Sequence, residues 1–336
     1  MRSTIEAVDE YPHSGYPRGW FQIGWCDEFA EGVAVPMTYF GRSLVAYRGE
    51  SGVVHVFDAH CPHLGAHLGY GGIIEGDCIR CPFHGWKYDA EGFNIDIPYS
   101  TKTYGRVGLR KWHTCEIGSL VLVWYDDAGR EPMWDPPLIP ELDDPDTYRV
   151  YPGFTHIWRG LKIRPQYIVE NTVDIAHQTW VHHSPSEHRL VDWEINDHMC
   201  RSRQSLTFGA GKEKTWLTPN GPVEAVLDVE CWGVGFNVAR FIGTDDSAHV
   251  ASHTPIDELH IDERLTVIMK PEPGYEDSPS EGAIKRFKFE VKQFEFDVTV
   301  WENMRYVARP PWVPEEGQVF REFRQWVGTF YEPLTR

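Results

Sequence analysis

Four residues in two short segments have the types and spacing of a metal site. Cys61 and His63 form a C-x-H pair, and Cys81 and His84 form a C-x2-H pair seventeen residues later. Each segment therefore offers one thiolate and one imidazole, donors that suit zinc and iron. Pro and Gly residues around both pairs are typical of loops. The pattern indicates one metal site held between two loops.

Two metal groups match this donor set. A Cys2His2 zinc site has the same ligands, but zinc motifs usually pair Cys with Cys and His with His. One Cys and one His on each loop fit a Rieske [2Fe–2S] cluster, in which one iron carries two thiolates and the other two imidazoles. We therefore predict such a cluster at Cys61, His63, Cys81 and His84, with Trp86 packed over it to exclude water.

The segment ENTVDIAHQTWVHH contains a second candidate site. Asn171, Asp174 and His177 recur every three residues and would follow one side of a helix. His182 and His183 lie five and six residues beyond His177, and neither is ideally placed on a straight helix at about 100° per residue. The helix should bulge or end before the second ligand, and spacing alone does not choose between the two histidines.

The elements around the first site are short strands broken by Gly turns. They predict an all-β sandwich or small barrel, with strands at residues 33–38, 43–48, 53–58 and 119–125. The stretch 126–146 is rich in Pro and Asp, without a sustained period, and indicates a linker. We expect two domains, residues 1–135 and 136–336.

The residue pattern in the second half of the sequence predicts an α+β domain in which strands are followed by helices. Residues 165–182 have a helical pattern. Alternating segments suggest an antiparallel sheet at 205–211, 225–243, 249–257 and 264–271. Residues 281–308 and 315–332 then predict two helices. We expect a helix-grip type arrangement of this sheet and its helices.

Both motifs resemble those of Rieske non-haem iron oxygenases. CPHLGAH…CPFHGWKYDAEG resembles their Rieske segment, and IPYSTKTYGRVGLRKWHTCEIGSLVLVWYDDAGREP resembles the same domain in the sterol and steroid branch. That branch includes 3-ketosteroid 9α-hydroxylases and cholesterol 7-desaturases. The resemblance runs over most of residues 17–135. It implies a mononuclear Fe(II) site in the second domain, besides the [2Fe–2S] cluster.

The resemblance also assigns expected roles around His177. The branch pattern N-x2-D-x2-H-x4-H selects His182 as the second iron ligand, whereas related enzymes with a five-residue spacer would select His183. It implies that Asp174 links His84 of a neighbouring subunit to His177, which requires a ring such as a homotrimer. Asn171 would lie near the iron or be a helix-surface amide.

A carboxylate must complete the facial triad of a non-haem iron site. In the family it lies far downstream, before an aromatic-rich segment. QFEFDVTVWENMRY offers Glu295, Asp297 and Glu302 there, and Asp297, four residues before Trp301, matches best.

These sites imply reductive activation of O2 to hydroxylate or desaturate a bulky apolar substrate, expected to be a steroid or sterol. One alternative is the same chemistry on an aromatic or other small molecule, and another is a Rieske electron carrier without oxygenase activity. GAGKEK lacks the spacing of a nucleotide-binding loop. We therefore expect a separate NAD(P)H-dependent reductase, and in some systems a ferredoxin, as electron donor.

Composition excludes several other classes. The net charge of −18, spread along the chain, argues against nucleic-acid binding. The sequence has no run of about 18 apolar residues that would predict a transmembrane helix. The N-terminus lacks the pattern of a signal peptide, and seven cysteines do not suggest a disulfide framework, so we expect a cytoplasmic protein.

Overall fold

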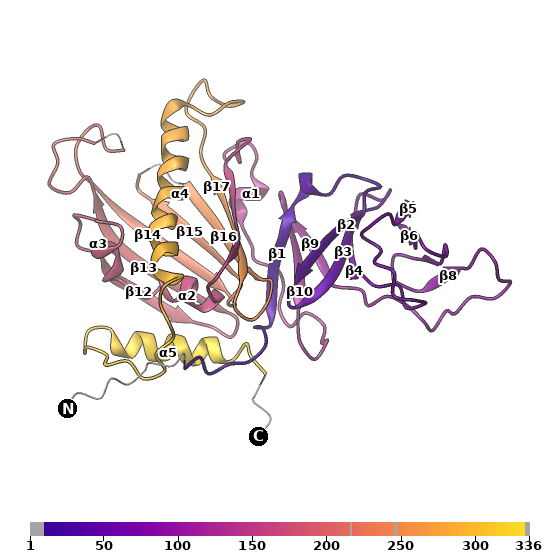
Figure 1. Cartoon of the computed structure of the whole chain (residues 1–336). Coiled ribbons are helices and arrows are strands. Elements are labelled where there is room, and N and C mark those ends of the chain that lie inside the picture. Colours follow the sequence, from indigo (N-terminus) through magenta and orange to yellow (C-terminus); the bar gives the residue numbers. More distant parts are fainter. Residues whose placement is uncertain (1–9, 216, 245–246, 333–336) are drawn as a thin grey trace.

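A computed structural model describes residues 10–215, 217–244 and 247–332 of the chain. The molecule has two parts (Figure 1): a β-rich N-terminal part extends to one side of a larger part built on a broad sheet. The N-terminal part holds the two Cys/His loops. The larger part holds the segment around His177 and the C-terminal helices.

The N-terminal part consists of short antiparallel strands. Its three sheets have the orders β1-β10-β9, β2-β3-β4 and β5-β6-β7-β8. The strands are β1 (Gly19–Trp25), β2 (Val35–Tyr39), β3 (Arg42–Arg48), β4 (Val54–Asp58), β5 (Ile73–Glu75), β6 (Cys78–Arg80), β7 (Lys87–Tyr88), β8 (Asn94–Asp96), β9 (Thr114–Ile117) and β10 (Leu120–Tyr125). A 3-10 turn, Cys26–Glu28, follows β1.

The predicted strands of this part are confirmed to within two residues at each end. β10, LVLVWY, is buried at every position, which explains why it reads as an unbroken apolar run. β3 and β4 are buried in their centres and pair in register, Ala46 opposite Val56. Their apolar side chains form the cores from which the Cys/His loops project.

The larger part is built on one antiparallel sheet of order β11-β17-β16-β15-β14-β13-β12. Its strands are β11 (Thr155–Leu161), β12 (Arg189–Ile195), β13 (Met199–Phe208), β14 (Val223–Trp232), β15 (Phe236–Ile242), β16 (Ser247–Pro255) and β17 (Ile261–Ile268). The sequence analysis did not predict β12 or the first half of β13, because many polar residues in them obscure the alternation of apolar and polar side chains that is typical of a strand. The predicted α+β class with a helix-gripped antiparallel sheet is confirmed.

The helices are shorter than the sequence predicts. They are α1 (Pro140–Asp143), α2 (Pro165–Glu170), α3 (His177–Trp180), α4 (Glu281–Trp301) and α5 (Gly317–Gly328). The prediction of one helix over 165–182 is therefore wrong: the chain leaves the helix after α2 and forms only one more turn. The stretch 281–308 is helical only to Trp301, and 315–332 only from Gly317 to Gly328.

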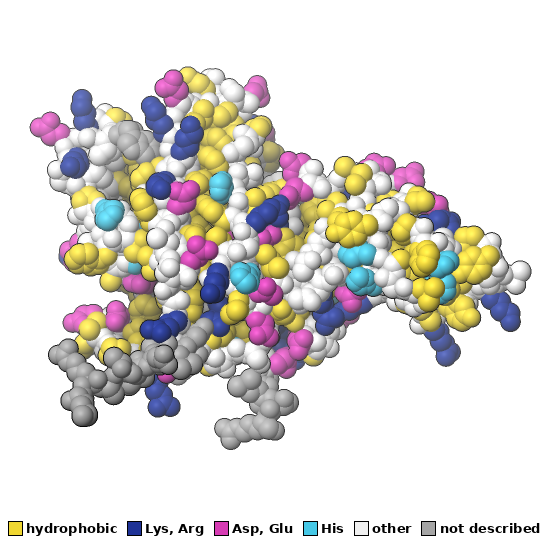
Figure 2. Space-filling model, viewed as in Figure 1, with side chains coloured by type: hydrophobic (Ala, Val, Ile, Leu, Met, Phe, Trp, Pro, Cys, Tyr) yellow, Lys and Arg dark blue, Asp and Glu magenta, His cyan; other side chains and the backbone are white. Residues whose placement is uncertain are grey.

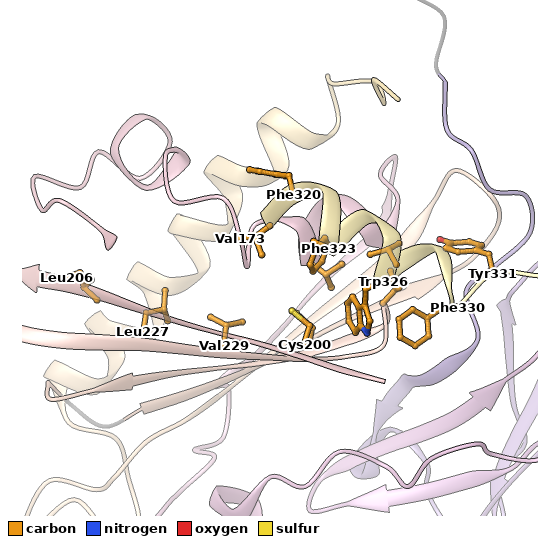
Figure 3. Close-up of a cluster of buried hydrophobic side chains, with 14 of the residues drawn as sticks. Val173, Cys200, Leu206, Leu227, Val229, Phe320, Phe323, Trp326, Phe330 and Tyr331 are labelled. Atoms are coloured by element: carbon orange, nitrogen blue, oxygen red, sulfur yellow. The ribbon is translucent and has the colours of Figure 1, made fainter. Parts of the chain in front are cut away.

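Two helices cover the sheet at different places. α4 lies across one face of the sheet (Figure 1), and its first turn is capped by Ser280, whose Oγ accepts a hydrogen bond from the Ala283 N–H. α5 covers the end of the same face. Figure 3 shows Phe323 and Trp326 of α5 lying over the strands near Cys200.

Polar contacts join the two parts of the molecule. The Trp25 indole N–H donates to Thr266 Oγ1 at 2.9 Å, and the fully buried Arg264 donates to the carbonyl oxygens of Gln22 and Ile23. These bonds attach β1 to β17, and they help hold the orientation of the two parts. The predicted division at residues 135 and 136 stays a prediction, and its outermost residues, 1–9 and 333–336, lie outside the described residues.

Candidate metal centres

The two Cys/His loops share one backbone conformation. Gly65 N–H donates to the Cys61 carbonyl at 2.9 Å, and Gly85 N–H donates to the Cys81 carbonyl at 3.0 Å. Both glycines have positive φ, 76° and 73°. A residue with a Cβ is strained there, so Gly ends each tight turn. The local sequence thus folds both loops in the same way and presents them as a pair.

The side chains of the loops meet. Cys61 and Cys81 are buried, and the ring centroids of His63 and His84 lie 4.7 Å apart. Trp86 stacks on His63, with centroids 4.6 Å apart and planes within 6°. The structure therefore brings the two loops together, with the two predicted histidine ligands in contact and Trp86 over one of them.

The donor set fits a [2Fe–2S] cluster. His63 Nδ1 is buried and has no hydrogen-bond partner in the described part of the chain, as expected of an atom reserved for a metal. Burial raises the pKa of the Cys61 thiol, and a bound cation is what favours the thiolate form there. The Tyr88 hydroxyl lies 3.1 Å from Cys61 Sγ, where it can donate to a thiolate.

An ion-pair network supports the second loop. Arg80 donates to the Gly85 carbonyl at 2.7 Å and pairs with Glu75 and Asp96, each at 2.9 Å. Glu75 also pairs with Lys87 at 2.9 Å. Hydrogen bonds from Arg80 and Lys87 lower the pKa of Glu75 to about 2. The network therefore ties β5, β6 and β8 to the turn that carries two of the cluster ligands.

The second site brings together three predicted residues from distant parts of the chain. His177, His182 and Asp297 each offer a ligand atom, and these atoms lie within 4.8 Å of one another. His182 Nε2 is 3.3 Å from Asp297 Oδ2. His177 begins α3, His182 follows its end, and Asp297 faces them from α4. Two imidazoles and one carboxylate are the donor set of a facial triad.

The competing candidates do not join this group of ligand atoms. His183 is exposed, has a positive φ of 53°, and its ring centroid lies 6.1 Å from that of Phe296. Glu295 pairs with Lys292 at 2.9 Å, and Glu302 accepts a hydrogen bond from the Lys162 N–H. The helix ends before the second ligand, as expected, and this end turns His182 toward Asp297.

Asn171 is not a helix-surface amide. Its Nδ2 donates to Asp297 Oδ1 at 3.2 Å and lies 3.4 Å from His177 Nε2. Gln178, which the sequence analysis did not consider, lies 3.2 Å from the same His177 nitrogen. Both amides therefore border the triad. The sequence shows Gln178 next to the predicted ligand His177, but glutamine is so common on helices that its position there indicates no specific role.

Asp174 positions His177 through two contacts. The His177 backbone N–H donates to the Asp174 carboxylate at 3.2 Å, while the His177 Nδ1 lies 2.6 Å from the Asp174 carbonyl oxygen. The Asp174 carboxylate is 3.8 Å from Nδ1, beyond hydrogen-bond distance. The ring is thus held by the main chain, and its Nε2 faces the triad. Burial alone would lower the pKa of His177, but Asp174 and Asp297 outweigh it and raise that pKa.

A cavity of about 460 Å³ opens from the triad between α4 and the sheet. This volume lies within the usual range for small-molecule sites. Much of its wall is apolar, formed by Leu206, Leu227, Val229, Phe241, Leu265 and Phe294. Figure 3 shows Leu206, Leu227 and Val229 along the strands under α4, continuous with the core that α5 closes. Polar residues that the sequence analysis missed also line it, among them His188 and Gln204.

Comparison with known proteins agrees with the family resemblance. Residues 123–331 match the family described as the 3-ketosteroid 9α-hydroxylase C-terminal domain. This chain belongs to that family. Residues 19–113 match the Rieske [2Fe–2S] domain. The family resemblance inferred from the motifs is therefore confirmed, and the chain is a Rieske-type oxidoreductase.

Relatives of this 3-ketosteroid 9α-hydroxylase family member span most of its length. It is 30% identical to cholesterol 7-desaturase of Bombyx mori, over 94% of this chain and 70% of the relative. It is 28% identical to a probable 3-ketosteroid-9-alpha-monooxygenase oxygenase component of Rhodococcus rhodochrous, over 95% of this chain and 81% of the relative.

Solved structures share the fold at lower identity. Dicamba monooxygenase bound to dicamba has a TM-score of 0.72 and 18% identity, covering 94% of this chain and 99% of that chain. NdmB of Pseudomonas putida CBB5 has a TM-score of 0.68 and 18% identity, covering 92% of this chain and 89% of that chain. None of the helices in the described ranges is long and apolar enough to cross a membrane.

Proposed function

We propose that this chain is the terminal oxygenase component of a multicomponent system that hydroxylates or desaturates a steroid or sterol. The observation that carries the proposal is the group of His177, His182 and Asp297 in the wall of a largely apolar cavity. The same chain holds the four-residue cluster site. A pure electron carrier needs neither the triad nor the cavity.

The cofactors follow from the two donor sets. Cys61, His63, Cys81 and His84 would hold the [2Fe–2S] cluster, and the triad would hold the mononuclear iron. When bound, the cluster supplies electrons one at a time and the iron provides open positions at which O2 is activated.

The side chains around the triad have supporting roles. The Asp174 carbonyl fixes the ring orientation of His177, and the Asn171 amide holds one oxygen of Asp297, leaving the other toward His182. Apolar walls exclude water and orient the substrate over the triad. The reacting carbon must lie at the cavity end nearest Asp297.

Electron delivery favours a ring of subunits. Figure 1 shows β5, β6 and β8, beside the cluster loops, at the opposite end of the molecule from α3. A short path therefore requires the loops of a neighbouring copy. His84 is half-buried, and the side chain of Asp174 is 32% exposed, so both remain accessible. We propose a homotrimer in which the neighbour's cluster loops dock beside Asp174.

Exposed apolar side chains at the outer end of the N-terminal part support this docking. Figure 2 shows yellow and cyan side chains gathered there. Leu64 and Phe83, each next to a predicted cluster ligand, are more than 60% exposed. Such a patch on a protein surface is typical of a contact site.

The electron donor and the compartment complete the proposal. We propose an NAD(P)H-dependent reductase, with or without a ferredoxin, as the partner. All seven cysteines fall within the described residues and form no disulfides, which supports a reducing compartment such as the cytoplasm.

A turnover experiment tests the function. The iron-loaded chain, a surrogate reductase, NAD(P)H and O2 are incubated with a steroid panel and with single-ring aromatics, and products are identified by mass spectrometry. We expect a hydroxylated or desaturated steroid and no oxidised aromatic. Oxidation of the aromatics alone would replace the proposed substrate class, and no oxidation at all would overturn the enzymatic proposal.

A further inference from the structure

Positive charge is concentrated in one loop of the N-terminal part, residues 97–111, which we call the basic loop. It contains Lys102, Arg106, Arg110 and Lys111 and no Asp or Glu, although the whole chain has a net charge of −18. Lys102 and Arg106 are exposed. Figure 2 shows dark blue Lys and Arg side chains at the outer end of the N-terminal part. A basic patch on an acidic protein attracts partners of the opposite charge.

The acidic residues that precede the basic loop in the chain have other partners. Asp96 pairs with Arg80 at 2.9 Å, and Glu91 pairs with Lys111 at 2.6 Å. The charges of the two exposed cations are therefore not cancelled by these acids.

Hydrogen bonds hold the basic loop against the strand before it. The Tyr104 N–H donates to Oδ1 of the buried Asn94 at 3.0 Å, and the Val107 N–H donates to the Tyr104 carbonyl at 2.7 Å. Ser100 Oγ donates to the Lys102 carbonyl at 2.8 Å. A surface that is ordered beforehand loses less conformational entropy when a partner binds.

Aromatic rings connect the basic loop to the cluster site. Trp86 stacks on His63 with centroids 4.6 Å apart, and Tyr104 stacks on Trp86 with centroids 5.6 Å apart. The Trp86 indole N–H donates to the Tyr99 hydroxyl at 2.8 Å. Tyr99 and Tyr104 are 64% and 58% exposed, whereas Trp86 is buried. The stack therefore leads from an exposed ring to a predicted cluster ligand.

We propose that the basic loop is the docking site of the electron donor, a protein with an acidic surface around its redox centre, and that Tyr104 and Trp86 connect that centre to the cluster. In each transfer the reduced centre of the donor loses one electron and the cluster gains it, and no covalent bond forms or breaks. This inference rests on the proposed function, in which a separate protein supplies the electrons. It adds the contact surface and the charge of that partner.

A second copy of the chain is the competing occupant, because it is acidic as well. The proposed contact between subunits involves His84 and the exposed Leu64 and Phe83, none of which belongs to the basic loop. The ring of Phe83 lies against His84, with centroids 3.8 Å apart, whereas the stack from Tyr104 ends at His63. The two imidazole ligands thus adjoin different surface residues, which favours separate contacts for the neighbour and the donor.

Binding and cluster reduction, both measured on the iron-loaded full chain without substrate, test the docking site. The probe is a plant-type [2Fe–2S] ferredoxin, an acidic protein whose potential lies below that of a Rieske cluster, so that electron transfer is favourable. Titration of the oxidised proteins gives the affinity, and stopped-flow absorbance gives the rate of reduction by the reduced ferredoxin. We expect both to fall as the salt concentration rises, because exposed charges are then screened.

Charge reversal tests the position of the contact. Lys102→Glu/Arg106→Glu should lower the affinity and the second-order rate constant on the order of tenfold or more at low salt. Lys285→Glu/Lys288→Glu on α4 is the matched control, because it changes the net charge equally at exposed positions of the larger part. It should alter either quantity by less than about twofold. Visible absorption checks that each variant retains the cluster.

Replacement of Tyr104 separates the electron path from docking. At saturating ferredoxin, Tyr104→Ala should slow cluster reduction severalfold, because it removes the ring between Trp86 and the donor. Tyr104→Phe keeps the ring and should be reduced at the wild-type rate. Equal limiting rates in these two variants would contradict the path through the stack.

The remaining outcomes decide the docking site. Equal losses in the two charge-reversal variants, or no salt-dependent binding of ferredoxin to the wild type, would overturn it. A changed subunit number in Lys102→Glu/Arg106→Glu, with unchanged ferredoxin affinity, would assign the basic loop to a contact between copies. A wild type that is reduced as expected but oxidises no steroid would keep this inference and remove the proposed function. Ferredoxin-supported steroid oxidation that the charge reversal leaves unimpaired would do the opposite.

Discussion

The side-chain amide of Asn171 donates a hydrogen bond to Asp297 Oδ1 across 3.2 Å and thereby joins the end of α2 to the C-terminal part of α4. These residues are 126 positions apart in the sequence. The contact orients the carboxylate that completes the triad. Partners of this kind are as much a part of a metal site as its ligands, since they fix the direction of the donor atoms.

Replacing Asn171 should weaken the mononuclear site without affecting the cluster. We expect Asn171→Ala to lower iron affinity at the triad by about 10- to 100-fold, the usual effect of losing a residue that orients a ligand. Competition with a graded chelator measures that affinity, and visible absorption reports the cluster. Asn303→Ala is the control, because the Asn303 amide contacts the Thr299 carbonyl at the end of α4. Equal affinities in the two variants would contradict the proposed role.

The choice between the adjacent histidines can be tested by iron content. His182→Ala should retain the two irons of the cluster and lose the mononuclear iron, because it removes a triad ligand. His183→Asn should retain both, since the imidazole is exposed and Asn tolerates the positive φ of 53°. Elemental analysis against acid-labile sulfide distinguishes the two sites. The reverse pattern would assign the ligand to His183.

The two loop glycines should differ in their tolerance of a methyl group. Both have positive φ, so alanine costs about 1–2 kcal/mol at either position. At Gly85 a Cβ would also meet Pro98 Cγ at 2.8 Å, whereas at Gly65 nothing lies within 4 Å in the described structure. We therefore expect Gly85→Ala to lower the free energy of unfolding and cluster occupancy more than Gly65→Ala does. Equal losses would show that Pro98 moves aside.

The ion-pair network at Glu75 should give a pH-dependent contribution to stability. Its pKa is lowered to about 2 in the folded chain, below its ordinary value of 4.5. A lowered carboxyl pKa stabilises the fold above the ordinary value, and this contribution is lost as the pH falls through 4.5 toward 2. Glu75→Gln should therefore unfold at lower denaturant concentration than wild type at pH 7, with the difference shrinking as the pH falls toward 3. A constant difference would mean that the charge of Glu75 is not what the variant removes.

Local signals were enough to predict the two loops of the cluster site and the way each of them turns. Cysteine, histidine, proline and glycine stand at fixed offsets within each loop, and both loops take the same turn because of these residues. The strands at 43–48 and 119–125 could also be predicted from the sequence, since an apolar run of this length indicates a buried strand. Asp297, far downstream, was predicted only through the family resemblance, because nothing in its charged helix distinguishes it from the other acidic residues there.

The break in the predicted helix depends on contacts that the sequence does not reveal. The carbonyl of Thr172 accepts hydrogen bonds from Ser202 Oγ at 2.8 Å and from Gln204 Nε2 at 3.3 Å, both on β13. These two side chains supply the hydrogen bonds that a backbone N–H would donate to this carbonyl if the helix continued. Residues Arg286 and Glu290, which line the cavity, were missed for a related reason. An i, i+4 ion pair is typical of a solvated helix face, and only the tertiary structure buries this one.

A single-turnover measurement tests most directly that this one chain is the complete oxygenase. The iron-loaded chain is fully reduced, freed of reductant, and mixed with O2 and a steroid ketone in the absence of any reductase. The reduced cluster and the mononuclear iron together hold the two electrons that one oxidation requires. We predict up to one oxidised steroid per chain, and none from Asp297→Ala despite reoxidation of its cluster. Reoxidation of both centres in the wild type with the steroid unchanged would contradict the account.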